Sequence, residues 1–100
     1  MVFESVLQPK VEAEMAFVLD APDITVEEVR AAVRGECAAI EIVGSRIADW
    51  KIGIVDTVAD NGSSAAFVLS PSIIPIDEVD LLGARMRLTQ NDIEASAGVG

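Results

Sequence analysis

The chain has 100 residues, a net charge of -10 and an isoelectric point near 4.1. A chain of this length forms one domain at most and buries about two thirds of the surface that its unfolded form exposes. Hydrophobic residues make up 51% of the sequence and aromatic residues only 4%, so we expect a small aliphatic core. The acidic charge argues against nucleic acid and against an anionic membrane surface as partners, because both repel it.

The sequence contains no His and a single cysteine, Cys37. The absence of His removes the usual general base and the commonest ligand for zinc or copper, so acid/base chemistry falls to carboxylates, Lys or water. One cysteine forms neither an intrachain disulfide nor a thiolate metal cluster, which fits a reducing compartment. The first residues, MVFESVLQPK, lack the pattern of a signal peptide, and no apolar run has the length of a transmembrane helix. We therefore expect a cytoplasmic protein.

The first strong pattern is a strand at residues 8–19, QPKVEAEMAFVL, which Pro9 separates from a short edge strand expected at residues 1–7. Side chains alternate along a strand, so one face is apolar and the other carries Glu12 and Glu14. These residues are roughly 6.5 Å apart along the strand, close enough for their carboxylates to repel in a poorly solvated place. A shared proton, a Lys or Arg, or a hard cation such as Mg²⁺ or Mn²⁺ would compensate. Alone, this spacing is also common on solvated strand faces.

A further carboxylate in an otherwise apolar strand follows a predicted helix. Thr25 and Glu28 have the spacing of a capping box, and Gly35 supplies a helix stop, so we expect a helix between them. Residues 36–43, ECAAIEIV, return to strand character and place Glu41 amid Ala, Ile and Val, where a carboxylate is costly to bury unless it is paired or ligates a metal. A crossover through the helix could bring Glu41 beside Glu12 and Glu14. Three carboxylates without His describe an oxygen-rich site for Mg²⁺ or Mn²⁺.

The rest of the chain reads as a long polar loop followed by short strands. Residues 44–64 form the loop, in which Ser63 and Ser64 could bind an anionic ligand or simply close the turn at Asn61-Gly62-Ser63. Strands are expected at 65–69 and 80–90, with a linker at 71–75 between them, and residues 93–97 should pair back on the last strand as a hairpin. The hairpin would leave an uncovered edge or apolar face. The fold class is therefore α+β, with a mixed β-rich core and one crossover helix.

Three phrases carry a resemblance to a known family: QPKVEAEMAFVL at 8–19, AIEIVGSRIADWKIGIVDTVADN at 39–61, and the GSSAAFVL that follows. Together with MRLTQNDIEASAG they resemble the 2-keto-4-pentenoate hydratase and 4-oxalocrotonate decarboxylase family, within the fumarylacetoacetate hydrolase superfamily. The resemblance covers nearly the whole chain and implies part of the C-terminal-like fold of that superfamily. It also implies a Mg²⁺ or Mn²⁺ site formed by Glu12, Glu14 and Glu41, the residues that the strand patterns already single out.

Within the family, Gly44 followed by SRI is closer to the hydratases, because decarboxylases more often carry Asp at that position. The implied reaction adds water to 2-hydroxypenta-2,4-dienoate, the enol of 2-oxopent-4-enoate, and gives 4-hydroxy-2-oxopentanoate in aromatic meta-cleavage catabolism. The divalent cation would stabilise the enolate charge. Ser63 and Ser64 lie in the phrase that would help to hold the small-molecule dienoate. The alternative within the family is a 4-oxalocrotonate decarboxylase.

Members of the family are considerably longer, and residues 1–100 match the central part of the hydratase catalytic domain, so we expect a single partial domain. The family's catalytic Lys lies in a preceding domain, and neither Lys10 nor Lys51 occupies its position, so no catalytic acid/base residue is assigned. Proton transfer needs a positioned acid/base group beside the ion, so the sequence leaves both an active and an inactive short chain open. A reading from another class is a non-catalytic β-rich module that self-associates through its uncovered apolar surface, and a homo-oligomer is expected in either case.

Overall fold

The computed structural model describes residues 5–99. The described residues of 1–14 and 40–68 form one compact unit, and those of 15–39 and 69–100 form a second. Within the described residues, the strands form a three-stranded sheet and a two-stranded sheet. Short helices and 3-10 turns lie between the strands. The predicted α+β class is confirmed. The edge strand predicted at 1–7 lies partly outside the described residues, and 5–7 are not in a strand.

The larger sheet has the strand order β1-β2-β3. Its strands are β1 (Lys10–Leu19), β2 (Val33–Val43) and β3 (Ser64–Leu69). Backbone hydrogen bonds define how β1 and β2 pair: in the second unit the Asp20 N–H donates to the Ala32 carbonyl, and in the first unit the Ser45 N–H donates to the Leu7 carbonyl. The end of each strand therefore meets the start of the other, so β1 and β2 run antiparallel.

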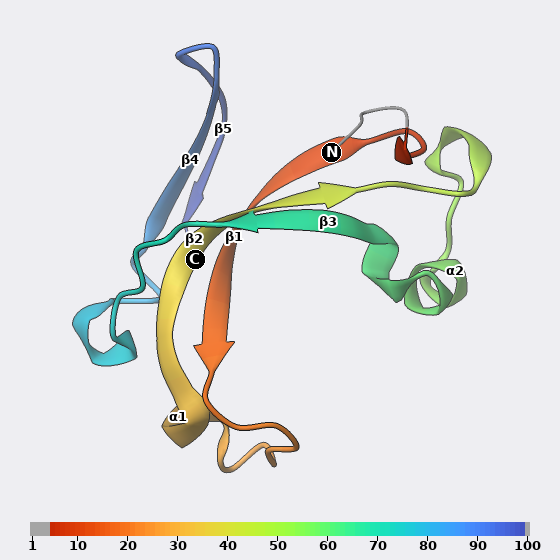
Figure 1. Ribbon diagram of the computed structural model, residues 1–100. Helices are drawn as coiled ribbons and strands as arrows, with labels where there is room; N and C mark the ends of the chain where they lie inside the picture. Colours follow the sequence, from red (N-terminus) through yellow and green to blue (C-terminus); the bar gives the residue numbers. More distant parts are fainter. Residues whose placement is uncertain (1–4, 100) are drawn as a thin grey trace. The chain divides into compact units, whose positions relative to one another are not determined.

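The third strand, β3, also pairs with β2 in the antiparallel direction. The Gly44 N–H donates to the Ser63 carbonyl and the Ser70 N–H donates to the Ala38 carbonyl, and the arrows of β2 and β3 point in opposite directions in Figure 1. The connection from β1 to β2 thus differs from the predicted crossover. A crossover returns a strand parallel to the first and needs a dozen or more residues, usually a helix. The helix here is too short for that.

That helix, α1, spans only Val29–Ala32. The reciprocal contact between Thr25 and Glu28 is present in part, since the Glu28 carboxylate accepts hydrogen bonds from the Thr25 N–H at 3.0 Å and hydroxyl at 2.9 Å. These bonds, the backbone one first, lower the pKa of the Glu28 carboxyl below its usual value. The Glu28 N–H, however, donates to the Thr25 carbonyl rather than to its hydroxyl. The contact closes a turn instead of starting a long helix.

Gly35 was expected to end the helix, and the structure corrects this, because Gly35 lies buried inside β2. The chain at Ile73 and Ile74 passes so close that a Cβ on Gly35 would lie 2.6 Å from the Ile74 carbonyl oxygen. Beside it, Glu36 and Ile74 exchange two backbone hydrogen bonds of 2.8 Å. Gly35 is therefore a point of close backbone approach, which is the other common reason for a glycine in a strand.

The predicted loop at 44–64 contains more regular structure than expected. A 3-10 turn, η2 (Ala48–Trp50), is followed by α2 (Ile54–Ala59) and a second 3-10 turn, η3 (Asn61–Ser63). Asp56 starts α2, since its carboxylate accepts a hydrogen bond of 2.9 Å from the Gly53 N–H. The turn predicted at Asn61-Gly62-Ser63 is confirmed, and all three residues have positive φ angles.

In the second unit, a 3-10 turn, η4 (Ile76–Glu78), precedes the hairpin of β4 (Arg85–Gln90) and β5 (Ile93–Val99). The predicted hairpin is confirmed, with antiparallel pairs from Arg85 and Val99 to Gln90 and Ile93 and an irregularity between Leu88 and Thr89. The strand predicted from residue 80 begins only at Arg85. The reason is that the Asp80 carboxylate accepts a hydrogen bond from the Gly83 N–H and holds a turn there.

The buried apolar residues are few within the described part of the chain, and the most enclosed are Cys37 and Val43. Cys37 is a free thiol. Many large apolar side chains are exposed, among them three on α2, namely Ile54, Val55 and Val58. The expected small aliphatic core is thus accompanied by a large apolar surface. Among residues 5–99, no helix combines the length and the hydropathy needed to cross a membrane.

Candidate metal centre

Three carboxylates gather on one face of the sheet in the first unit. Glu12 and Glu14 project from β1 and Glu41 projects from the neighbouring strand β2, and one carboxylate oxygen from each lies within 4.8 Å of the others. This carboxylate cluster contains the three residues that the sequence singles out. Strand alternation explains the pairing of Glu12 with Glu14, and the β1-β2 contact brings Glu41 to them.

The donor set of the carboxylate cluster fits a hard divalent cation. All three side chains offer carboxylate oxygen, which Mg²⁺ and Mn²⁺ prefer, and the sequence has no His to favour zinc or copper. Glu12 and Glu14 are exposed and Glu41 is half-buried, so the site is open to solvent on one side. The exposed Glu12 and Glu14 side chains can rotate toward a common ion, whereas Glu41 is more enclosed by its neighbours.

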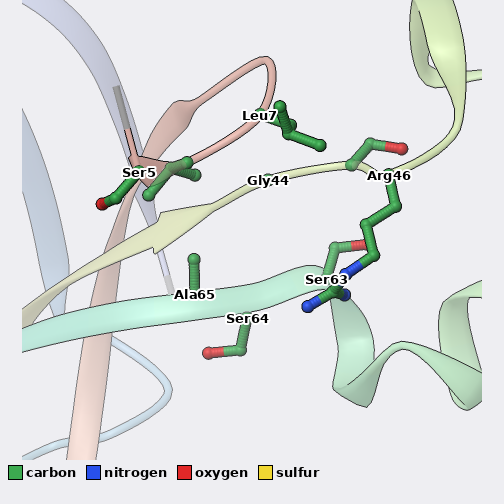
Figure 2. Close-up of a pocket in the computed structure, with 9 residues that line it drawn as sticks. Ser5, Leu7, Gly44, Arg46, Ser63, Ser64 and Ala65 are labelled. Carbon is green, nitrogen blue, oxygen red and sulfur yellow. The ribbon is translucent and has the colours of Figure 1, made fainter. Parts of the chain in front are cut away.

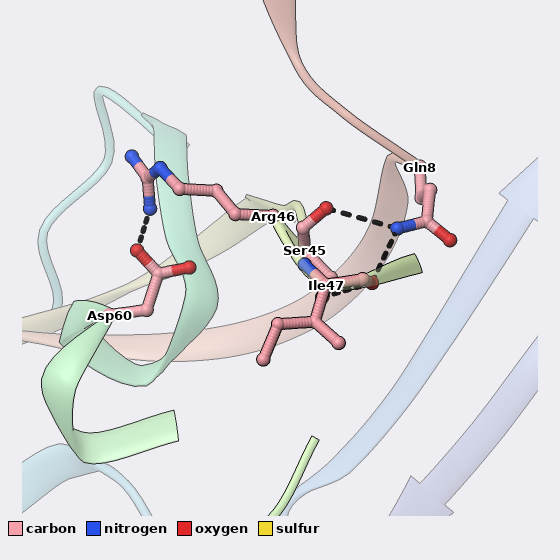
Figure 3. A network of polar contacts seen from close by, with 5 residues as sticks. All are labelled: Gln8, Ser45, Arg46, Ile47 and Asp60. Atoms are coloured by element: carbon pink, nitrogen blue, oxygen red, sulfur yellow. Dashed lines mark hydrogen bonds and ion pairs between the residues drawn. The ribbon is translucent and has the colours of Figure 1, made fainter. Parts of the chain in front are cut away.

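A network of hydrogen bonds around Gln8 ties the start of β1 to the segment after β2 (Figure 3). The Gln8 side-chain amide donates to the carbonyls of Ser45 (3.0 Å) and Ile47 (2.8 Å), and its oxygen accepts from the Asp49 N–H (2.8 Å). The Gln8 carbonyl accepts a further bond of 3.1 Å from the Trp50 indole N–H. This network fixes the loop that follows β2 against the start of β1, the strand that carries Glu12 and Glu14.

Sequence reasoning missed this network. The partners of Gln8 lie some forty positions away in the chain, and Gln8 itself adopts a positive φ of 51°. A Gln ahead of a Pro carries no pattern that predicts either feature. The signal that was present is the Trp in the polar segment after β2, because a buried or half-buried Trp usually needs a partner for its N–H.

Ser63 and Ser64, the predicted substrate-binding residues, line a pocket of about 140 Å³ together with Gly44, Ser45 and Arg46 (Figure 2). Ser63 is buried and only 6% exposed, so its hydroxyl lies at the inner wall of this pocket. Ser64 begins β3, and its side chain leaves the strand on the side opposite to that of Ala65 (Figure 2). Of the two, Ser63 therefore has the better placed hydroxyl for a ligand in this pocket.

Arg46 supplies the positive charge beside this pocket. Its guanidinium forms an ion pair with Asp60, drawn in Figure 3, although most of the Arg46 side chain is exposed. The neighbouring Ser45 is fully buried, and its hydroxyl donates to the Ile47 carbonyl and accepts from the Ile47 N–H. Ser45 is thus occupied in holding the loop, while Arg46 is at the surface of the pocket.

The sequence matches the model of the fumarylacetoacetate (FAA) hydrolase C-terminal domain over residues 2–100. The chain belongs to this family. Curated FAA hydrolase relatives include the TodF product hydratase of Pseudomonas putida, 46% identical over 97% of this chain and 38% of its own length, and the 2-keto-4-pentenoate hydratase of Paraburkholderia phymatum, 46% identical over 100% of this chain and 40% of its own. A 2-hydroxyhexa-2,4-dienoate hydratase of Comamonas testosteroni is 42% identical over 94% of the chain.

Among solved structures, the FAA hydrolase fold of this chain is similar to a 4-oxalocrotonate decarboxylase from Pseudomonas putida G7, complexed with magnesium and adipate. The TM-score is 0.83 at 27% identity, over 96% of this chain and 38% of the decarboxylase. The chain therefore spans about two fifths of the length of the relatives that it matches. The family resemblance read from the sequence is confirmed.

Proposed function

We propose that this chain is the metal-binding part of a divalent-metal-dependent hydratase that adds water to 2-hydroxypenta-2,4-dienoate and gives 4-hydroxy-2-oxopentanoate. The observation that carries the proposal is the carboxylate cluster of Glu12, Glu14 and Glu41 in a chain whose relatives at 46% identity are named as hydratases. Water addition to the conjugated dienoate leaves the carboxylate and the 2-oxygen in the product, so the metal and the oxygen-binding groups serve substrate and product alike. The chain spans about two fifths of the length of these relatives, so the hydratase activity is proposed by comparison with the longer proteins, with the carboxylate cluster as the metal site.

In this proposal Glu12, Glu14 and Glu41 hold Mg²⁺ or Mn²⁺. When bound, such an ion supplies positive charge that stabilises a developing enolate on the 2-oxygen of the substrate. The three carboxylates keep the ion on the open side of the sheet, where Glu12 and Glu14 are exposed. Ser63, which lines the pocket beside Arg46, donates a hydrogen bond to the substrate, and Ser64 supports it from the start of β3. No acid/base residue is assigned.

The 4-oxalocrotonate decarboxylase is the second candidate. Its support is the solved decarboxylase with a TM-score of 0.83, which also contains magnesium. The hydratase reading is favoured because the hydratase relatives are 46% identical and the decarboxylase structure is 27% identical. Measuring carbon dioxide release distinguishes the two activities. Hydration consumes the dienoate without releasing carbon dioxide, whereas decarboxylation of 4-oxalocrotonate releases it.

We further propose that the protein works in the cytoplasm as a homo-oligomer. The single free cysteine and the exposed apolar side chains of α2 support this, since Val55 is 78% exposed and large apolar surfaces favour association. Light scattering on the purified protein tests the oligomer. Association with no metal binding and no turnover would instead favour the non-catalytic module.

The metal site is tested by calorimetric titration of the purified protein with Mg²⁺ and with Mn²⁺. Saturable binding to the wild type, lost in Glu12→Gln/Glu14→Gln, is expected. The matched control is Glu27→Gln/Glu94→Gln, which removes the same charge from two exposed residues outside the carboxylate cluster and should bind as the wild type does. Equal binding by both double variants would overturn the assignment of the metal to these residues.

A further inference from the structure

A lysine precedes the carboxylate cluster on the same strand. Lys10 is the first residue of β1, and alternation along the strand puts its side chain on the face that carries Glu12 and Glu14. Its ammonium nitrogen lies 4.2 Å from the centroid of the Trp50 ring. Lys10, Trp50 and the three carboxylates all belong to the first unit of the chain.

The position of the Trp50 ring is fixed by the Gln8 network. The indole N–H donates to the Gln8 carbonyl, and the Gln8 side chain accepts from the N–H of Asp49, the residue before Trp50. Both contacts begin two residues ahead of Lys10 in the chain. The Trp50 ring is therefore fixed close to the start of β1. The Lys10 ammonium lies over the face of this ring, where the ring quadrupole attracts a cation.

Lys10 makes no ion pair with any residue in the range 5–99, although the chain is strongly acidic. The ion pairs within this range involve Arg30, Arg46 and Lys51 with aspartates. A lysine beside carboxylates would ordinarily turn toward them, but here it rests on Trp50. The ammonium hydrogens that face away from the ring therefore remain available to an anion.

We propose that Lys10, held against Trp50, binds the carboxylate group of the 2-oxo or 2-hydroxy acid that occupies the carboxylate cluster. This inference rests on the proposed function. A carboxylic acid that approaches three glutamates is repelled by each of them, and a neighbouring cation on the same face offsets that repulsion. Holding the ammonium on the ring before the ligand arrives reduces the conformational entropy that binding must remove from a long side chain.

Oxalate is a suitable probe, because it carries adjacent carboxylate oxygens and undergoes no hydration. The protein is titrated first with Mg²⁺ and then, at saturating Mg²⁺, with oxalate, by calorimetry. In Lys10→Met the affinity for Mg²⁺ should be unchanged or higher, since a positive charge has left the neighbourhood of the glutamates, whereas the affinity for oxalate should fall about tenfold. The chain has one Trp, so a change in Trp50 emission on oxalate binding gives a second readout in the wild type.

The matched control is Lys51→Met, which removes the same charge from an exposed lysine whose nitrogen lies 3.6 Å from an Asp49 carboxylate oxygen. Its oxalate affinity should change by less than about twofold. If Lys10→Met does not fold, Lys10→Arg and Trp50→Leu provide the same test, because the first keeps the cation on the ring and the oxalate affinity, and the second loses both.

Equal oxalate affinities for the wild type and Lys10→Met would overturn the role of Lys10 and leave the metal site intact. A weaker Mg²⁺ affinity in Lys10→Met would also overturn it, since the lysine would then be supporting the structure of the site. An absence of Mg²⁺ and Mn²⁺ binding to the wild type would overturn the proposed function instead.

Discussion

An oxygen of the Glu41 carboxylate on β2 lies within 4.8 Å of an oxygen of the Glu14 carboxylate on β1, with no cation of the protein paired to either within the described residues. Two unit charges about 4 Å apart repel by about 1 kcal/mol even in bulk water. The carboxylate cluster is therefore arranged at some cost to the metal-free fold.

Replacing Glu41 by Gln separates the destabilising repulsion between the carboxylates from the stabilisation expected when they bind a metal ion. Without metal, Glu41→Gln should be as stable as the wild type or more stable by up to about 1 kcal/mol, because two repulsions are removed. With Mg²⁺ the order should reverse, since the variant binds the ion about tenfold more weakly or worse and gains less stability from it. Thermal unfolding with and without Mg²⁺ measures both, with Glu27→Gln as the control. A Mg²⁺-dependent increase in Tm equal to that of the wild type would contradict the prediction.

Gly44 leaves no room for a side chain. A Cβ there would lie 2.6 Å from the Val6 side chain and 2.9 Å from the Leu7 carbonyl oxygen. Gly44→Ala should therefore destabilise the protein by about 1–3 kcal/mol through overpacking. At Gly98 a Cβ would meet nothing within 4 Å, so Gly98→Ala is the control and should change stability by less than about 0.5 kcal/mol. Urea unfolding of the two variants checks this, and equal midpoints would show that the close approach at Gly44 is relaxed in solution.

Ser63 and Ser64 should respond in opposite directions to replacement by Gly. Ser63 has a φ of 63°, in the left-handed region, so Ser63→Gly should stabilise the fold by about 1 kcal/mol. Ser64 has a φ of -66°, so Ser64→Gly should cost about 0.5–1 kcal/mol. Thermal melts give the two signs. If Ser63 also holds the substrate, Ser63→Gly will raise the KM for the dienoate while it raises Tm, and a lower KM would argue against that role.

The Thr25–Glu28 contact predicts a pH dependence. The two hydrogen bonds from Thr25 lower the pKa of Glu28 from 4.5. A carboxyl whose pKa is lower in the folded state stabilises the fold fully above its unfolded pKa, and this contribution is lost as the pH falls through the folded pKa. The stability difference between the wild type and Glu28→Ala should thus be constant from pH 7 to about 5 and shrink below 4.5. Glu27→Ala is the control, and a difference that grows on acidification would be inconsistent with this sign.

Strands and the carboxylate cluster could be predicted from the sequence because both depend on alternation, which is local. The period of two in residues 8–19 separates Glu12 and Glu14 from the apolar face, and Glu41 interrupts an apolar strand in the same way. The family resemblance names the same residues. Their juxtaposition needed only that β1 and β2 be neighbours, and it arose although the connection is antiparallel rather than the expected crossover.

Features that depend on distant backbone approach could not be predicted. Gly35 has the spacing of a helix stop, yet its role is set by Ile73 and Ile74, which no local pattern links to it. The Gln8 network likewise depends on the carbonyls of Ser45 and Ile47 and on the N–H of Asp49, groups that lie about forty positions along the chain from Gln8. Side chains that hydrogen-bond to remote backbone groups leave little trace in a single sequence.

The hairpin of β4 and β5 has a consequence for the order of folding events. Its strands are joined by Asn91 and Asp92 alone, both with positive φ angles, so its contacts close a very short loop. Such hairpins form within about 1–10 microseconds. β1 instead pairs with a strand that begins at Val33, and the Gln8 bonds close a still longer loop, so they follow later. We expect the hairpin to form early and the face with the carboxylate cluster to assemble last, so a cation held there would bind late on the folding pathway.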